Sequence, residues 1–416
     1  MWEEDEDRLV NKSQKDDFLN LSFLPKTFKD FFLPAGFPAS VSDDYLDYML
    51  LQFPTNVTGW ICHTLVTSSL LKAIGVGSFS RASIAASTAA IQWVSKDGLG
   101  AIGRLVIGGR FGTLFDDDPK QWRMYADIIG SAGSIFELST QLYPEFFLPL
   151  ASLGNLTKAI ARGLKDPSFR VIQNHFSISA NLGEIAAKEE VWEVTAQLIG
   201  LALGILIMDS PWIQDSYFIH AFTWLGIRLL HLWLRYKSLY VLQFRTINFK
   251  RARILVRSHV LYDSVPGYPN ANKEEELFAW EIFLQPNILF GGSMETMISE
   301  DFNPLVKALL ELYAQEKYIL FVNQRGSKVL NYYVTFKVGA TNLAVLKSLW
   351  HVYWLHQYQQ EHDINDILAW LSESFLVLED GFAAFLSQLE DAGWSQHQII
   401  LKVPNNILFE DDDSAL

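Results

Sequence analysis

The stretch from Asp44 to Met208 restricts the possible folds more than any other feature of the chain, because it contains long segments without a charged face. It is rich in Ala, Gly, Ser, Leu and Ile. A helix on the surface of a soluble protein carries polar residues on the side that faces water. We therefore expect the helices of this stretch to be buried in a protein core or to contact lipid.

The most apolar segment is Val194–Met208, with the sequence VTAQLIGLALGILIM. It is shorter than the roughly 20 residues that a perpendicular membrane span requires. The next apolar segment, Ile213–Leu234, is long enough, but it contains Asp215, His220 and Arg228. The sequence therefore leaves two alternatives open, insertion into a membrane and a large soluble helical bundle.

Glycine recurs inside these apolar segments, and Gly200 and Gly204 form a GxxxG pattern. Glycine in a water-exposed helix costs about 1 kcal/mol relative to alanine. Small residues at this spacing let two helix backbones approach closely. The pattern predicts a tightly packed helix pair.

The last third of the chain has a different character. Lys317–Val322 and Val329–Lys337 are rich in β-branched and aromatic residues, and Asn323–Ser327 between them is typical of a hairpin turn. Helices are expected at Thr341–Gln359 and Ile364–Ala392, and a third strand at Gln398–Val403. The predicted fold class is mainly α: a Gly/Ala-rich helical bundle, membrane-embedded in one of the two alternatives, followed by a small α+β C-terminal domain.

The predicted domains follow from these changes in composition. They are an acidic N-terminal tail (1–30), a helical domain (31–260), a linker (261–301), a small α+β domain (302–408) and an acidic tail (409–416).

Composition and motifs exclude several functions. The net charge of −14 argues against nucleic-acid binding. Cys62 is the single cysteine, which excludes an intramolecular disulfide and a Cys-based metal site. His351 and His356 are five residues apart and do not share a helix face as metal ligands would. Gly98, Gly100 and Gly103 match a dinucleotide motif, but a helix-like segment precedes them. We expect no enzyme activity, metal or cofactor.

The segment from Arg228 to Val260 contains eight basic residues and no Asp or Glu. They are Arg228, Arg235, Lys237, Arg245, Lys250, Arg251, Arg253 and Arg257. Basic residues accumulate beside anionic membrane surfaces, so the segment is predicted to bind such a surface. The alternative is that acidic residues from elsewhere in the chain, or from a partner, neutralise it.

Several ordered blocks between residues 30 and 210 carry a family resemblance. They are LPAGFPASV at 33–41 with Asp44 and Tyr45, LKAIGVG at 71–77, WVSKDGLG at 93–100 with Gly103 and Arg104, DPKQWR at 118–123 with Ala126 and Asp127, and His175 with Asn181, Ala187 and Lys188. Together they resemble the root-UVB-sensitive family. The chain departs from the family pattern at Lys165–Arg170, where a Gly-rich run is usual, and at Glu189–Glu190, where Asp-Gly is usual.

The resemblance implies a regulatory, non-catalytic protein of the plastid (chloroplast), associated with its membranes. It further implies links to the UV-B response, vitamin B6 homeostasis and auxin transport, and pairing with a paralogue or with a second copy. A membrane transporter or small-molecule binding protein, for an anion or a pyridoxal-phosphate-like ligand, is one alternative, and a soluble scaffold is another. The acidic start, MWEEDED, is unlike a transit peptide, so none is visible in this chain.

Ionisable residues within or beside the apolar segments form the candidate polar site, because a buried charge needs a partner. These are Lys96, Asp97, Arg104, Lys120, Arg123, Asp127, Arg170, His175, Lys188 and Glu189. If they bind a ligand, Lys96 and Asp97 should lie close to Lys188 and Glu189. The competing interpretation is a set of structural ion pairs.

Overall fold

The computed structural model describes residues 25–74, 105, 114–278, 285–291, 302–323, 330–359, 367–403 and 408–409. The chain forms two compact units: unit 1 contains Met1–Val106 and Ala126–Val241, and unit 2 contains Ile107–Tyr125 and Leu242–Leu416. The described residues are mainly helical, with their strands in unit 2, which confirms the predicted fold class. The domain boundaries proposed from the sequence stay a prediction.

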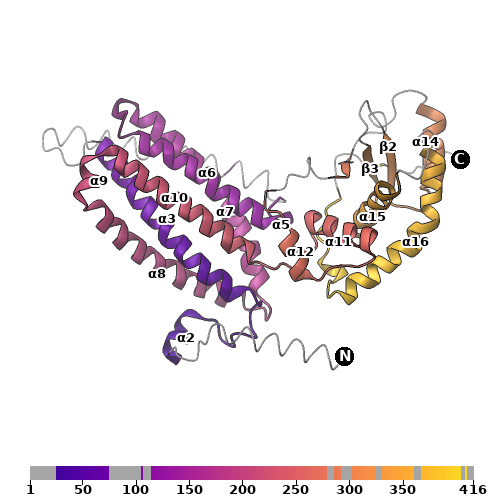
Figure 1. Ribbon diagram of the computed structural model, residues 1–416, viewed down its shortest axis with the longest axis horizontal. Helices are drawn as coiled ribbons and strands as arrows, with labels where there is room; N and C mark the ends of the chain where they lie inside the picture. The colour runs from indigo at the N-terminus through magenta and orange to yellow at the C-terminus, as the bar shows by residue number, and fades with distance from the viewer. Residues whose placement is uncertain are drawn as a thin grey trace. The chain divides into compact units, whose positions relative to one another are not determined.

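Unit 1 is a bundle of long helices in which α3 lies between α8 and α10 (Figure 1). Its elements are α2 (Lys26–Phe32), α3 (Tyr45–Ala73), α6 (Pro119–Ser139, of which the part from Ala126 belongs to this unit), the 3₁₀ turn η2 (Pro144–Phe146), α7 (Phe147–Phe176), α8 (Leu182–Met208), α9 (Pro211–Asp215) and α10 (Tyr217–Tyr240). Ser216 caps the start of α10, because its side chain accepts a hydrogen bond from the Ile219 backbone N–H.

The predicted GxxxG packing is confirmed between α8 and α3. A Cβ atom added to Gly200 would lie 2.6 Å from Trp60 Cβ and 2.7 Å from the Val57 carbonyl oxygen. At Gly204 the added atom would lie 2.8 Å from Thr64 Cβ. The two backbones therefore approach more closely than any residue with a side chain would allow.

Unit 2 combines helices with a four-stranded sheet. Its helices are α5 (Leu114–Asp117), α11 (Phe249–Tyr262), α12 (Tyr268–Glu274), α14 (Phe302–Leu312), α15 (Asn342–Tyr358), α16 (Ile367–Asp391) and the 3₁₀ turn η4 (Gln396–Gln398). Its strands are β1 (Asn287–Phe290), β2 (Tyr318–Asn323), β3 (Asn331–Lys337) and β4 (Leu408–Phe409). β2 and β3 are antiparallel, with Tyr318 opposite Phe336, which confirms the predicted pairing.

The predicted third strand at Gln398–Val403 is wrong. This segment contains the end of η4 and a single bridge between Ile399 and Ile247. β2 occupies one edge of β3, and β1 and β4 pair with the other edge in parallel. Instead of joining the sheet, the backbone at Ile399 accepts a hydrogen bond from the Asn342 side chain.

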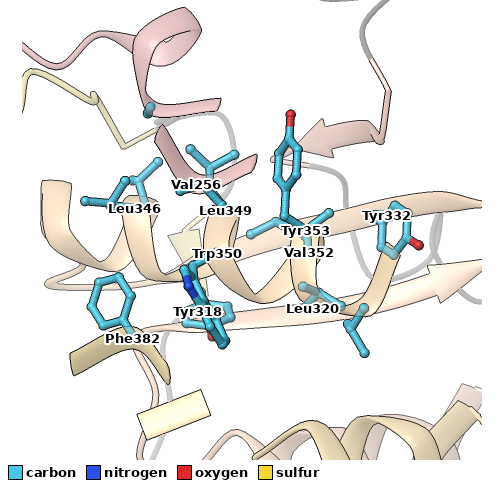
Figure 2. Close-up of a cluster of buried hydrophobic side chains, with 14 of the residues drawn as sticks. Val256, Tyr318, Leu320, Tyr332, Leu346, Leu349, Trp350, Val352, Tyr353 and Phe382 are labelled. Atoms are coloured by element: carbon cyan, nitrogen blue, oxygen red, sulfur yellow. The ribbon is translucent and has the colours of Figure 1, made fainter. Parts of the chain in front are cut away.

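The core of unit 2 surrounds α15. Figure 2 shows Leu346, Leu349 and Trp350 of this helix among side chains from neighbouring elements, including Val256 of α11 and Phe382 of α16. Apolar burial of this kind contributes roughly 1.5–3 kcal/mol for each large side chain. Unit 2 therefore has an apolar interior of the ordinary globular type.

Candidate functional site

Polar side chains are buried in the interior of unit 1, whereas many of its large apolar side chains face outward. The buried polar residues include Asp44, Gln52, Thr55, Thr58, Ser69, Glu137, Gln173, Glu189, His220, His231 and Arg235. A polar group removed from water needs hydrogen-bonding partners. The functional candidates of unit 1 are therefore best described by what each of these groups contacts.

One cluster joins the start of α3 to the end of α7. His175 Nε2 lies 2.9 Å from Asp44 Oδ2, and the Ser42 hydroxyl donates to Asp44 Oδ1 at 2.5 Å. Close by in the chain, the Asn181 side chain donates to the Ser40 carbonyl oxygen at 3.1 Å. Residues from two of the family-like blocks thus meet at this junction, although up to 141 positions separate them.

Glu189 lies on the adjacent part of α8 and is buried. The Gln173 side chain of α7 donates to Glu189 Oε2 at 2.5 Å. Among the described residues, Glu189 Oε1 and the buried Tyr45 hydroxyl make no hydrogen bond. Gln173 therefore satisfies one carboxyl oxygen and leaves the other available to a donor.

Lys188 has a different partner from Glu189. Its ammonium donates to the carbonyl oxygens of Asp30 at 2.5 Å and of Phe31 at 3.3 Å, at the C-terminal end of α2. A cation is favourable there because the helix dipole is negative at this end. The Trp192 indole donates to the Phe32 carbonyl oxygen at 2.9 Å. Lys188 and Trp192 together fix α2 against α8.

A second polar cluster connects α3, α6 and α10. Arg235 Nε donates to Asp127 Oδ2 at 2.5 Å, and another nitrogen of Arg235 donates to Gln52 Oε1. His231 lies 3.5 Å from the same Asp127 oxygen, and its Nδ1 is 2.9 Å from the Thr55 carbonyl oxygen. Arg235 is 1% exposed, so its charge depends on Asp127 and Gln52.

In unit 2 the candidate Lys120 belongs to a buried charge network around Glu275. Lys120 Nζ lies 3.0 Å from Glu275 Oε2, Arg251 Nε lies 3.2 Å from Oε1, and the Asn272 side chain accepts from Lys120 at 2.9 Å. Burial raises the pKa of Glu275, but Arg251 and Lys120 outweigh this effect and lower the pKa to about 2. Burial lowers the pKa of Lys120, and Glu275 opposes that shift.

Lys250 extends the network to Asp118 at 2.8 Å. Burial and the nearby Glu275 raise the pKa of Asp118, while Lys250 opposes the shift. All of these side chains are nearly excluded from water. Asp118 and Glu275 are therefore paired with Lys120, Lys250 and Arg251 inside unit 2, which is typical of a structural network.

Five further residues complete the set of candidates. Arg123 is buried in unit 2, and Arg170 is exposed on α7. Lys96, Asp97 and Arg104 lie outside the described residues. Their convergence with Lys188 and Glu189 stays a prediction. Of the described candidates, the structure brings His175, Lys188 and Glu189 to one end of unit 1.

The basic segment Arg228–Val260 is divided between α10, a loop and α11. Its residues Arg235, Lys250 and Arg251 pair with Asp127, Asp118 and Glu275, respectively. Arg253 donates to the Tyr353 hydroxyl at 3.0 Å and to the Pro286 carbonyl oxygen at 2.7 Å. Lys237, Arg245 and Arg257 are exposed. For the three paired residues, acids from elsewhere in the chain supply the counter-charge; binding of the segment to an anionic surface stays a prediction.

Sequence analysis did not identify a buried histidine relay in unit 2. The Tyr318 hydroxyl lies 2.9 Å from His351 Nδ1, and His351 Nε2 lies 2.6 Å from Ser374 Oγ. Ser374 donates its own proton to the Leu371 carbonyl oxygen, so His351 donates to Ser374. Burial lowers the pKa of His351 to about 3. No substrate reaches these groups, because all three side chains are enclosed in the core. The three residues come from separate elements, so no local motif signals the relay.

No group of three or more His, Cys, Asp or Glu side chains is placed to hold a metal ion within the part of the chain that the structure describes. The arrangement of the described site residues is therefore one of hydrogen-bonded pairs that hold helices together, with a single free carboxyl oxygen at Glu189.

Two family models match consecutive parts of the chain. Residues 20–263 match a family model described as "Vitamin B6 photo-protection and homoeostasis domain", and residues 264–405 match one described as "Root UVB sensitive protein, C-terminal".

Similar proteins carry related names. The chain is 58% identical to "Protein root UVB sensitive 5" of Arabidopsis thaliana, covering 99% of this chain and 82% of the relative. It is 32% identical to "RUS family member 1" of Dictyostelium discoideum, over 60% of this chain and 47% of the relative. It is 26% identical to "Protein root UVB sensitive 2, chloroplastic" of Arabidopsis thaliana, over 89% of this chain and 82% of the relative. No solved structure matches the chain.

Proposed function

Because the chain belongs to the root UVB sensitive family, we propose that it is a non-catalytic regulatory protein, embedded in a membrane through unit 1. The observation that carries the membrane part of this proposal is the outer surface of α8. By length and composition, α8 is the one helix among the described residues that is able to cross a membrane, and 17% of its most apolar stretch is buried. A core helix of a soluble protein passes the same length test, but it is mostly buried.

The exposed side chains of α8 and α10 support lipid contact. Leu198 and Leu206 of α8 are 65% and 68% exposed, and Phe222 of α10 is 70% exposed. Further outward-facing residues on the two helices are Val194, Ile199, Leu203, Ile205, Phe218, Ile219, Leu225, Leu229, Leu230 and Trp233. A soluble monomer rarely exposes an apolar patch of this extent.

The dimensions are compatible with a thin membrane region. Val194–Met208 covers about 22 Å at 1.5 Å per helical residue, compared with roughly 30 Å for an average hydrocarbon core. A short apolar stretch is accommodated by local thinning of the bilayer and by charged side chains that extend toward the surface. Lys237 near the end of α10 has the required length and exposure.

The cellular role follows from the relatives. One similar protein is named chloroplastic, and the matched domain is described by vitamin B6 photo-protection and homoeostasis. We therefore propose that this chain acts in the plastid, in the responses to UV-B and in vitamin B6 homeostasis. The same proposal includes a link to auxin transport and pairing with a paralogue or with a second copy of this chain. The enclosed polar clusters, whose charged groups are paired with one another, support a regulatory rather than a catalytic role.

A matched pair of substitutions tests the membrane embedding. Leu198→Lys near the middle of α8 and Leu376→Lys on α16 both replace a strongly exposed leucine. A lysine at the centre of a spanning helix costs about 2.5–3.5 kcal/mol for insertion, whereas a lysine in water costs nothing comparable. We expect wild type and Leu376→Lys to stay in the membrane pellet after alkaline carbonate washing, and a larger fraction of Leu198→Lys to be released. Release of all three proteins into the supernatant contradicts the proposal.

The free oxygen of Glu189 favours a second candidate function, the binding of a small molecule that carries a hydroxyl or amine donor. Pyridoxine has such donors and fits the description of the matched domain. Binding of pyridoxine to the purified protein, measured by calorimetry, should be weakened by Glu189→Gln and unchanged by Glu190→Gln, which alters an exposed neighbour. Equal binding by both variants removes Glu189 from this role.

A further inference from the structure

The helices of unit 1 have two ends that contacts within the unit define. At one end, the start of α3 meets the end of α7 through the bridge between Val41 and Ser177. At the other end, Ser69 of α3 donates to the Gln141 side chain at 3.1 Å and lies 3.2 Å from His220 Nε2 of α10. α3, α6 and α8 end at this second end, whereas α7 and α10 begin there, so α7 and α10 run antiparallel to the other three helices.

Basic residues are distributed unequally between the two ends. The connections 140–146 and 209–216 contain Glu145, Asp209 and Asp215 but no Lys or Arg. Near these connections, Lys72 is the one basic residue in the described part of unit 1. We call this the acidic end.

The opposite end, which we call the basic end, is formed by α2, the starts of α3 and α8 and the ends of α7 and α10. Its basic residues include Lys26, Lys29, Arg170, Lys188 and Lys237. Lys and Arg in short connections and near the ends of spans set the orientation of a membrane protein, and they remain on the side from which it inserts. Asp and Glu contribute little to this rule, so the acids at the basic end do not cancel the effect.

Exposed aromatic side chains lie toward both ends. Tyr143, Phe146 and Trp212 are exposed at the acidic end, and Trp212 is 74% exposed. Phe31 and Tyr240 are exposed at the basic end. Trp and Tyr are enriched where a membrane protein passes through the two bilayer interfaces. α10 runs from one group to the other, and its 24 residues span about 36 Å, which is enough to cross a hydrocarbon core of roughly 30 Å.

The short helix α2 fits the interface at the basic end. Its backbone is fixed to α8 by Lys188 and Trp192, as described above, while Phe31 and Lys26 stay exposed. An apolar ring beside lysine side chains is the composition of a segment lying at the level of lipid headgroups.

From this distribution we propose that unit 1 crosses the bilayer in one fixed orientation, with its acidic end translocated and its basic end on the side from which the protein inserts. The inference rests on the proposed membrane embedding and adds the direction of every helix in unit 1. The partner of the surface between the two ends is the hydrocarbon of the bilayer, and the partner of the basic end is a headgroup layer that attracts cations.

The single cysteine makes this orientation measurable. Cys62 is buried, so wild type should not react with a membrane-impermeant maleimide and serves as the background control. In a Cys62→Ala background, or in wild type if that variant does not fold, one cysteine is placed at exposed Ser179 of the basic end, or at exposed Glu145 or Gln214 of the acidic end. The full chain is synthesised in a cell-free system with sealed membrane vesicles, whose outer face is the insertion side.

We expect Ser179→Cys to react before detergent is added, and Glu145→Cys and Gln214→Cys to react severalfold more after the vesicles are opened with detergent. The reverse pattern overturns the orientation and leaves the membrane embedding intact. Reaction of all three variants before detergent overturns both, because the two ends then share one side of the membrane. Protection of all three before detergent overturns the orientation, since Ser179 would not face the insertion side.

Discussion

Replacing Gly200 by alanine tests the close packing of α8 against α3. The added Cβ would lie 2.6 Å from Trp60 Cβ, about 0.8 Å short of the 3.4 Å at which ordinary contact begins. It would also lie 2.7 Å from the Val57 carbonyl oxygen, which belongs to the α3 backbone and cannot rotate away. Overpacking of this kind costs about 1–3 kcal/mol. Alanine returns about 1 kcal/mol through its higher helix propensity.

Gly226→Ala in α10 is the matched control, because nothing lies within 4 Å of the Cβ position at Gly226. Gly226→Ala therefore gains the stability that alanine's higher helix propensity supplies, without a steric clash. The difference in unfolding free energy between the two variants therefore equals the packing term, about 1–3 kcal/mol, or roughly 2–4 °C in Tm for each kcal/mol in a domain of this size. Thermal unfolding of the purified proteins in detergent, followed by circular dichroism, measures it. A Gly200→Ala protein as stable as Gly226→Ala refutes the close approach.

Three further substitutions test the buried polar groups. Asp127→Asn removes the charged partner of Arg235 Nε and should cost about 3–5 kcal/mol in detergent unfolding, against less than about 0.5 kcal/mol for the exposed control Asp166→Asn. Equal losses in the two variants contradict the pairing. Glu275 has a pKa lowered from 4.5 to about 2, so it contributes stability above pH 4.5 that is lost as the pH falls toward 2, about 3 kcal/mol in total. Glu275→Gln should remove this pH dependence of the unfolding free energy, and the exposed control Glu276→Gln should keep it. If Glu275→Gln keeps the wild-type pH profile, the network is contradicted. His351→Phe leaves the Tyr318 hydroxyl without its buried acceptor and should cost about 1–3 kcal/mol in denaturant unfolding. A loss no larger than that of the exposed control His397→Phe rules out the relay.

Local patterns predicted those parts of the fold that local chemistry determines. The β2–β3 pairing follows from two β-rich segments around a turn, and the α8 contact follows from two glycines four residues apart. The strand expected at Gln398–Val403 failed because composition does not show whether a sheet edge is free. β1 occupies that edge, and its four residues lie within a segment that was expected to be a linker.

The partners of the charged residues were not predictable from sequence alone. Asp127 and Arg235 are 108 positions apart, and Lys120 and Glu275 are 155 positions apart. The high cost of burying an unpaired charge predicted that partners exist. Their identity depends on which helices are neighbours, and one sequence does not contain that information in any local pattern. The acid-free segment at Arg228–Val260 illustrates this limit. Its counter-charges are Asp127 of α6, Asp118 immediately before α6 and Glu275 immediately after α12.

In the proposed membrane setting, the helices of unit 1 need other contacts than apolar burial to hold them together. Lipid tails are as apolar as leucine, so the hydrophobic effect does not hold helices together there, and close packing and interhelical hydrogen bonds take over. Unit 1 has both features, in the Gly200 contact with α3 and in the Asp127 cluster that joins three helices. Both units also bury apolar side chains, around Leu65 in unit 1 and around α15 in unit 2. Unit 1 differs in the apolar surface that α8 and α10 turn outward, which is the arrangement expected when lipid surrounds that unit.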